Sequence, residues 1–120
     1  MAGIRITLPW PPSVNLYWRH VNGRTLISRT GRTYRQQVMA AVLRQGAGMR
    51  YAGRLAISIL AYPPDRRRRD LDNVLKALLD ALQAAGVYED DEQIDDLRIR
   101  RAQVSRTGGS VVVEVMEVDG

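Results

Sequence analysis

Hydrophobic residues follow two different spacings along the chain. Apolar side chains at every second position predict strands over residues 4–8, 24–28, 55–61, 97–101 and 111–118. Apolar side chains at helical spacing predict helices over residues 31–45 and 71–85. We therefore expect one α/β domain over residues 1–120, in which two helices pack on one face of a mixed β-sheet.

Turn-forming residues indicate how these elements connect. The prolines of residues 9–12 end the first strand because proline has no backbone donor, and residues 13–20 are expected to form a loop. The Asn-Gly pair at 22–23 predicts a tight turn, after which the strand over 24–28 pairs with the first strand. Residues 107–110 predict a hairpin turn that makes the two flanking strands neighbours.

The predicted helix over 71–85 carries one apolar stripe, formed by Leu71, Val74, Leu75, Leu78, Leu79 and Leu82. Gly86 is placed to end the helix. Inside a regular helix the side chains of Asp70 and Asp72 would point apart, whereas in extended chain they would share a face. We expect the chain to be extended at Asp70 and helical from about Asp72, so that both carboxylates converge at the start of the helix.

Composition narrows the classes of function. The chain has 18 Lys and Arg residues against 13 Asp and Glu, a net charge of +5, and Lys76 is its one lysine. An arginine-rich basic chain indicates a nucleic-acid partner. The absence of cysteine excludes disulfides, thiolate catalysis and cysteine zinc sites. No segment approaches the length of a membrane span, so we expect a cytoplasmic protein with no membrane partner.

Four consecutive arginines, residues 66–69, directly precede Asp70 and Asp72. Arginines bind a phosphate backbone, and paired carboxylates hold a divalent cation such as Mg²⁺. This juxtaposition predicts metal-dependent hydrolysis of a phosphodiester. Lys76 lies one helical turn beyond Asp72, where its ammonium could stabilise charge or orient a phosphate.

A third carboxylate is needed to complete a metal site of this kind, and the acidic segment over residues 89–92 is its obvious source. Spacing does not choose among Glu89, Asp90, Asp91 and Glu92. The segment follows the helix and returns the chain toward the sheet. This position is the only reason in the residue pattern to expect the third carboxylate here.

A purely structural interpretation is open for the same residues. Asp70 and Asp72 could only cap a helix, and Lys76 could pair with Asp72 or Asp80. The acidic segment could be solvated. The protein would then be a non-catalytic module that binds branched DNA.

The sequence resembles the RusA family of phage-type Holliday-junction resolvases over nearly its full length. The most specific motif is Asp-Arg-Arg-Arg-Arg-Asp-Leu-Asp-Asn at residues 65–73; further matching positions are residues 8–13, Asn15, Tyr17, residues 23–25, Tyr34, Arg35, Lys76, Asp90 and Asp91. The resemblance implies a RusA-like endonuclease domain acting in DNA recombination and repair.

The resemblance also implies the parts of the reaction. The three essential carboxylates of the family correspond to Asp70, Asp72 and Asp91, which would bind Mg²⁺ (or Mn²⁺). The essential lysine of the family corresponds to Lys76. It implies a homodimer that makes paired symmetric nicks in strands of like polarity across four-way branched DNA.

Candidate DNA-binding residues surround these positions. They are Arg66, Arg67, Arg68, Arg69, Asn73, Asn15 and Arg19. Arg69 adjoins the acids and is expected to contact the region of the cleaved bond. Trp10 is expected to pack against the edge of the core, and the arginines of the helix over 31–45 are expected to face solvent.

Overall fold

A four-stranded mixed sheet forms the centre of the computed structural model, which describes residues 3–118. The strand order is β1 (Gly3–Pro9), β6 (Ser110–Glu117), β4 (Leu55–Tyr62) and β5 (Ile94–Arg101). β6 runs antiparallel to both β1 and β4, whereas β5 runs parallel to β4. The predicted α/β class with a mixed sheet is confirmed.

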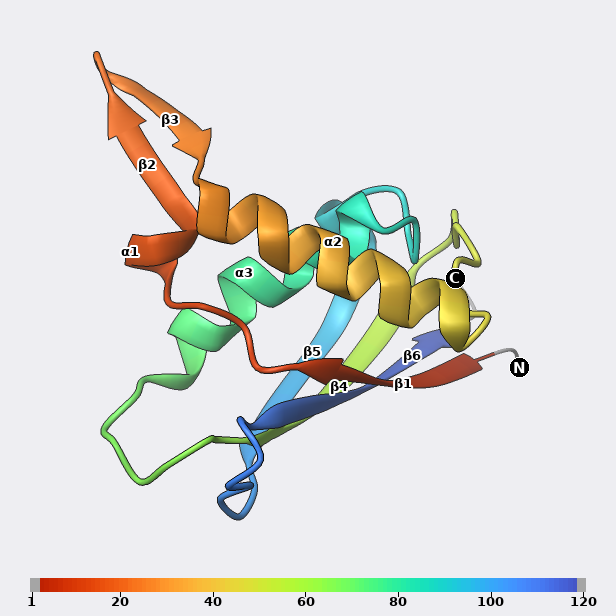
Figure 1. Ribbon diagram of the computed structural model, residues 1–120. Helices are drawn as coiled ribbons and strands as arrows, with labels where there is room; N and C mark the ends of the chain where they lie inside the picture. The colour runs from red at the N-terminus through yellow and green to blue at the C-terminus, as the bar shows by residue number, and fades with distance from the viewer. Residues whose placement is uncertain (1–2, 119–120) are drawn as a thin grey trace.

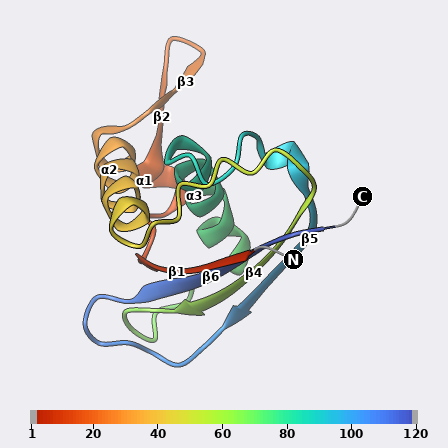
Figure 2. The ribbon, with the colours of Figure 1, turned by 90° about the vertical axis from the view of Figure 1, so that its right-hand side faces the viewer.

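All α-helices of the described residues lie on one face of the sheet (Figure 2). The two long ones are α2 (Arg29–Arg44) and α3 (Leu71–Ala84), and α1 (Val14–Tyr17) adds a single turn. Both predicted long helices are confirmed, and Gly86 ends α3 with a φ of 81°. None of the helices within residues 3–118 has the length and apolar character needed to cross a membrane.

The core lies between this helical layer and the sheet. Leu55, Ile57 and Ile59 of β4 are buried toward the helices, while Ser58 on the opposite face is exposed. On α3 the buried residues are Val74, Ala77, Leu78, Ala81 and Leu82. The predicted stripe is therefore rotated, because the small side chains Ala77 and Ala81 bring the helix close to its neighbours and leave the leucines at 71, 75 and 79 half-buried.

The prediction of a loop over residues 13–20 is wrong. The carbonyl of Ser13 accepts hydrogen bonds from the backbone N–H of Leu16 and Tyr17, which closes the turn of α1. Tyr17 is fully buried and anchors this turn in the core. The chain then continues directly into β2 (Trp18–Val21).

The predicted pairing of residues 24–28 with the first strand is also wrong. β3 (Arg24–Ile27) pairs antiparallel with β2 instead. The Asn22-Gly23 turn is confirmed, since both residues have positive φ (51° and 73°) and such a two-residue turn joins adjacent strands. The resulting two-stranded ribbon projects away from the body of the molecule (Figure 1).

The predicted hairpin at residues 107–110 is wrong as well, because β4 lies between β5 and β6. Residues 102–109 cross the end of β4 rather than turning back beside β5. The N–H of Ala102 donates to the carbonyl of Ala61 at 2.8 Å, and the N–H of Ser105 donates to Pro63 at 2.8 Å. This connection places the β5–β6 loop against the segment that carries the arginine run.

Candidate active site

The start of α3 holds the first two candidate carboxylates. Asp70 has extended backbone (φ −86°, ψ 138°) and the helix begins at Leu71, so the predicted change from extended to helical chain is confirmed to within a residue. Asp70 occupies the N-cap position, yet its side chain makes no capping hydrogen bond. Both Asp70 and Asp72 line a cavity of about 1040 Å³, here called the arginine cavity, which the run over 66–69 also lines.

Asp72 also lines a second cavity, of about 430 Å³, called here the acidic hollow. Its lining residues are Trp18, Asp72, Leu75, Lys76, Leu79, Asp80 and Asp91. Asp72, Lys76 and Asp80 are four residues apart along α3 and therefore share one helix face. Asp91 enters the hollow from a different element, so tertiary structure gathers charged groups that lie up to nineteen positions apart (72 to 91).

The charged groups at the start of α3 are not committed to internal contacts. Within residues 3–118, the side chains of Asp70, Asp72 and Lys76 form no hydrogen bond or ion pair. Neither the helix cap by Asp70 nor the pairing of Lys76 with Asp72 or Asp80 is formed. These three side chains are exposed and free to meet a ligand.

Three of the four acidic residues at 89–92 occupy different environments around the 3₁₀ turn η1 (Asp91–Gln93). Asp90 Oδ1 accepts the N–H of Glu92 at 2.9 Å and so caps the turn. Glu92 pairs with Arg54 at 3.1 Å. Asp91 lines the acidic hollow with Asp72, a distinction that spacing along the chain could not make.

Gln93 fixes this turn to the body of the protein. Its Oε1 accepts the N–H groups of Glu89 (2.9 Å) and Asp90 (2.7 Å), and its Nε2 donates to the carbonyls of Tyr51 and Gly53 at 2.8 Å each. The side chain is buried with both of its polar atoms satisfied. Gln93 therefore holds the backbone that leads into Asp91. Asp90 and Gln93 form a capping box, and their Asp-x-x-Gln spacing is the signal in the sequence that could have identified this contact.

Tyr88 contacts Asp91 from the core. Its hydroxyl lies 2.8 Å from Asp91 Oδ1 and 2.8 Å from the carbonyl oxygen of Leu79. Partial burial raises the pKa of the Asp91 carboxyl above its usual range. The nearby charges of Asp80 and Asp90 raise this pKa further, whereas the hydrogen bond from Tyr88 lowers it.

Asp80 is a fourth carboxylate beside the hollow and is held from α1 and α2. Arg35 donates to Asp80 Oδ2 through Nε at 2.8 Å and pairs with it through Nη2 at 2.7 Å. The Tyr17 hydroxyl donates to the same oxygen. The expectation that Arg35 faces solvent is wrong, because this ion pair joins α2 to α3 and leaves the Arg35 side chain only 33% exposed.

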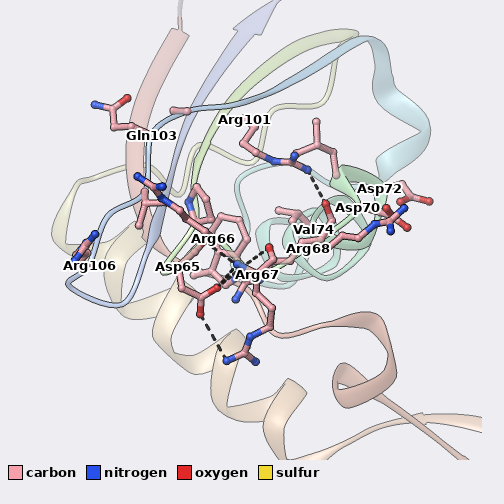
Figure 3. A pocket seen from close by; sticks show the side chains of 16 residues that line it. Asp65, Arg66, Arg67, Arg68, Asp70, Asp72, Val74, Arg101, Gln103 and Arg106 are labelled. Atoms are coloured by element: carbon pink, nitrogen blue, oxygen red, sulfur yellow. Dashed lines mark hydrogen bonds and ion pairs between the residues drawn. The ribbon is translucent and has the colours of Figure 1, made fainter.

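The arginine run divides into one structural residue and three exposed ones. Arg69 pairs with Asp65 at 2.7 Å, and its guanidinium carbon lies 5.7 Å from the centre of the Trp10 ring, a cation–π contact. Trp10 packs against the core as expected. Arg66, Arg67 and Arg68 are exposed, and Figure 3 shows Arg68 extended toward the side of the cavity where Asp70 and Asp72 lie.

The remaining candidate DNA-binding residues lie at the edges of this region. Asn73 lines a hollow of about 390 Å³ with Arg68, Arg69 and Asp70. Asn15 on α1 and Arg19 on β2 are both exposed. Trp18, which adjoins Arg19, lines the acidic hollow, so the projecting ribbon begins beside the candidate site.

The candidate carboxylates lie along α3 without closing on one point, with Asp70 and Asp72 at its start and Asp91 beside the acidic hollow. No group of three acidic, histidine or cysteine side chains within residues 3–118 lies close enough together to hold a metal ion. The chemistry of the donors nevertheless fits a hard divalent cation, because Asp70, Asp72 and Asp91 offer carboxylate oxygens only. Such ions keep several waters and use one or two protein carboxylates, so a fully closed protein cage is not required.

Exposed carboxylates beside an arginine-lined cavity, with a free lysine in the adjoining hollow, are typical of enzymes that hydrolyse nucleic-acid phosphodiesters. The model of a family described as endodeoxyribonuclease RusA matches residues 9–116. The chain therefore belongs to the RusA family of endodeoxyribonucleases. The predicted family and enzyme class are confirmed.

Relatives match this chain over nearly its whole length. A protein of Enterobacteria phage HK97 named crossover junction endodeoxyribonuclease is 43% identical over 119 residues, 99% of this chain and 98% of the relative. Proteins of the same name from Shigella sonnei and Escherichia coli are 44% and 43% identical over 113 residues, in each case 94% of this chain and 93% of the relative.

Proposed function

We propose that this chain is a structure-selective endodeoxyribonuclease that resolves Holliday junctions in DNA recombination and repair. The names of its relatives support this substrate, since they describe crossover junction endodeoxyribonucleases. The observation that carries the proposal is that three charged side chains at the start of α3 are free of internal contacts within residues 3–118. Asp70 and Asp72 line the arginine cavity, and Lys76 lines the acidic hollow, which Asp72 also lines.

Mg²⁺, for which Mn²⁺ could substitute, is the proposed cofactor, held by Asp70, Asp72 and Asp91. When bound there, it would lower the pKa of a water molecule and offset negative charge on the phosphate. The chain prepares this site by orienting its ligands. The Tyr88 hydroxyl restrains Asp91, and Gln93 fixes the backbone around it.

Lys76 is proposed to act on the phosphate itself. Its ammonium stands on the same face of α3 as Asp72, and no carboxylate within residues 3–118 neutralises it. It is placed to donate hydrogen bonds to a phosphate oxygen and to stabilise the charge that grows there as the bond breaks. A compact ammonium with three donors suits this role.

The exposed arginines are proposed to hold the DNA. Arg66 and Arg68 form no ion pair within residues 3–118, and Arg67 pairs with Asp65 only at 3.7 Å. All three side chains are exposed, and their guanidinium groups match phosphate oxygens. Arg69 is proposed to position this loop as well as to contact DNA, since Asp65 and Trp10 hold its side chain.

We further propose that the chain acts as a homodimer that makes paired symmetric nicks in strands of like polarity. Resolution of a four-way junction requires two cuts, and each chain carries one set of candidate acids. A two-fold dimer would present two identical sites to a two-fold substrate. Sedimentation equilibrium should give twice the chain mass of 13.5 kDa. A protein that is monomeric both when free and when bound to a junction would contradict the dimer.

The substrate and metal are tested by cleavage of a synthetic four-way junction and a linear duplex of the same sequence, each with Mg²⁺ and with EDTA. The proposal predicts metal-dependent nicking of the junction alone. A junction that is bound but never cut with any divalent metal would instead identify a non-catalytic protein that binds branched DNA. Equal cutting of duplex and junction would contradict the proposed selectivity.

A further inference from the structure

The arginine cavity has a second wall that the arginine run does not supply. Arg101, the last residue of β5, and Arg106 of the β5–β6 loop line the same cavity as Arg66 and Arg68 (Figure 3). Arg66 and Arg106 also line a smaller adjoining hollow of about 220 Å³. Two segments more than thirty residues apart (66–69 and 101–106) thus contribute cations to one space.

The β5–β6 loop is fixed in this position by its backbone. The hydrogen bonds from Ala102 to Ala61 and from Ser105 to Pro63 fasten it beyond the end of β4. Gly109 has a φ of 76°, and a Cβ at this position would lie 2.8 Å from Pro64 Cδ. Only glycine permits this approach, so the loop that carries Arg106 is held directly against the segment that leads into the arginine run.

A side-chain contact joins the two walls. Arg101 Nη2 donates to the backbone carbonyl of Arg69 at 2.6 Å. Arg69 is the residue before Asp70, so this bond couples the end of β5 to the position of the first candidate carboxylate. The two walls are therefore built in relation to each other before any ligand arrives.

Six arginines line the cavity, and an acid pairs with only two of them in the described residues. Asp65 pairs with Arg69 at 2.7 Å and with Arg67 at 3.7 Å. In the described part of the chain, Arg66, Arg68, Arg101 and Arg106 form no ion pair with a carboxylate. Asp70 and Asp72 lie where α3 begins, and Figure 3 shows Arg66 and Arg106 on the other side of the cavity from them.

We propose that Arg101 and Arg106 bind backbone phosphates of the DNA arm that leads away from the cleaved bond. This inference rests on the proposed function. The β5–β6 loop and the arginine run then form the two sides of a phosphate-binding channel. A strand whose reactive phosphate lies at Asp72 passes between them, and its neighbouring phosphates meet the guanidinium groups of both walls.

The test is the salt dependence of junction binding, measured by fluorescence anisotropy in EDTA so that no cleavage occurs. Arg106→Gln is compared with Arg44→Gln, which removes an exposed arginine from the last turn of α2 and thus the same charge. The logarithm of the binding constant falls as the logarithm of the salt concentration rises. Loss of one phosphate contact should make this negative slope shallower by about 0.9. Adding Arg101→Gln should make it shallower by about 0.9 again. Arg44→Gln should leave the slope unchanged.

Equal slopes for Arg106→Gln and Arg44→Gln would overturn the inference. Because Arg101 also holds the backbone, Arg106→Gln alone decides the result if the double variant fails to fold. Phosphate-ethylation interference supplies a second readout, in which one or more interfering phosphates of the wild-type complex should be lost in Arg106→Gln. An identical footprint would count against the inference. If Arg106→Gln shows these effects but the wild-type protein never cuts a junction, the proposed function is wrong, whereas phosphate binding by the β5–β6 loop stands.

Discussion

The Tyr88 hydroxyl lies 2.8 Å from Asp91 Oδ1, which links the hydrophobic core to the candidate active site. Tyr88 is only 1% exposed, so its ring position is set by core packing. The hydroxyl has one proton and two acceptors within reach, Asp91 and the carbonyl of Leu79. Asp91 is therefore oriented by a group that is itself immobilised.

Tyr88→Phe should reduce junction cleavage by about 10- to 100-fold, the usual effect of removing a residue that orients a metal ligand. The hydrogen bond to Asp91 also lowers the pKa of that carboxyl, so its removal should move the acidic limb of the rate profile to higher pH. Single-turnover rates measured across the acidic limb of the pH–rate profile give both effects.

Tyr51→Phe is the matched control. The Tyr51 hydroxyl is buried and has no hydrogen-bond partner within residues 3–118. Its removal should raise the unfolding free energy by up to about 1 kcal/mol and leave cleavage unchanged. Equal cleavage rates in Tyr88→Phe and wild type would contradict the role given to Tyr88.

Arg35→Gln should destabilise the fold by about 1 to 2 kcal/mol, because it removes charged hydrogen bonds to Asp80 between α2 and α3. Urea unfolding measures this change. Arg44→Gln, which removes the same charge from α2 but at an exposed position, should cost less than about 0.5 kcal/mol. If both variants lose the same stability, the Arg35 pair does not join the helices.

The loop before α3 should contribute to stability in a pH-dependent way. The guanidinium of Arg69 and the backbone N–H of Arg67 lower the pKa of Asp65 to about 2. Because the folded-state pKa is depressed, this contribution is complete above the ordinary carboxyl pKa of about 3.9 and is lost as the pH falls toward 2.

Asp65→Asn removes this titration. The difference in unfolding free energy between wild type and Asp65→Asn should be constant above about pH 5 and shrink below about pH 4. Urea titrations at several pH values measure it. A difference that does not change with pH would show that the carboxylate charge is not involved.

Lys76→Ala should lower the single-turnover cleavage rate by about 100-fold or more, the usual loss when one donor to a developing negative charge is removed. Junction affinity should change little, since the exposed arginines remain. Anisotropy and single-turnover cleavage on the same junction separate the two quantities. Unchanged turnover would remove Lys76 from the site.

Local pattern predicted most elements of the fold but not their pairing. Apolar residues at every second position identify Leu55, Ile57 and Ile59 as one face of a strand. Apolar residues at helical spacing identify α2 and α3. Neither pattern contains information about which strand lies beside which. The position of β6 between β1 and β4, and the β2–β3 ribbon, depend on contacts such as the burial of Tyr17 that no short segment encodes.

The candidate site likewise contains residues that a local motif identifies and residues whose role depends on tertiary contacts. Asp70, Asp72 and Lys76 belong to one local motif and could be selected from sequence. Asp91 could not be distinguished from its acidic neighbours by spacing, because its environment depends on Tyr88 in the core and on the capping of η1 by Asp90. The long-range contacts of Arg35, Gln93 and Arg101 could not be predicted, since each joins residues more than thirty positions apart in the chain.

The most direct measurement of the central claim is cleavage of a four-way junction by wild type and Asp72→Asn side by side with Mg²⁺, with junction affinity determined for both. We predict paired nicks by wild type and cleavage by Asp72→Asn that is slower by about 100-fold or more. Binding by the variant should be equal or tighter, because one repelling negative charge is gone. Cleavage by Asp72→Asn at the wild-type rate would contradict the claim that the start of α3 carries the reaction.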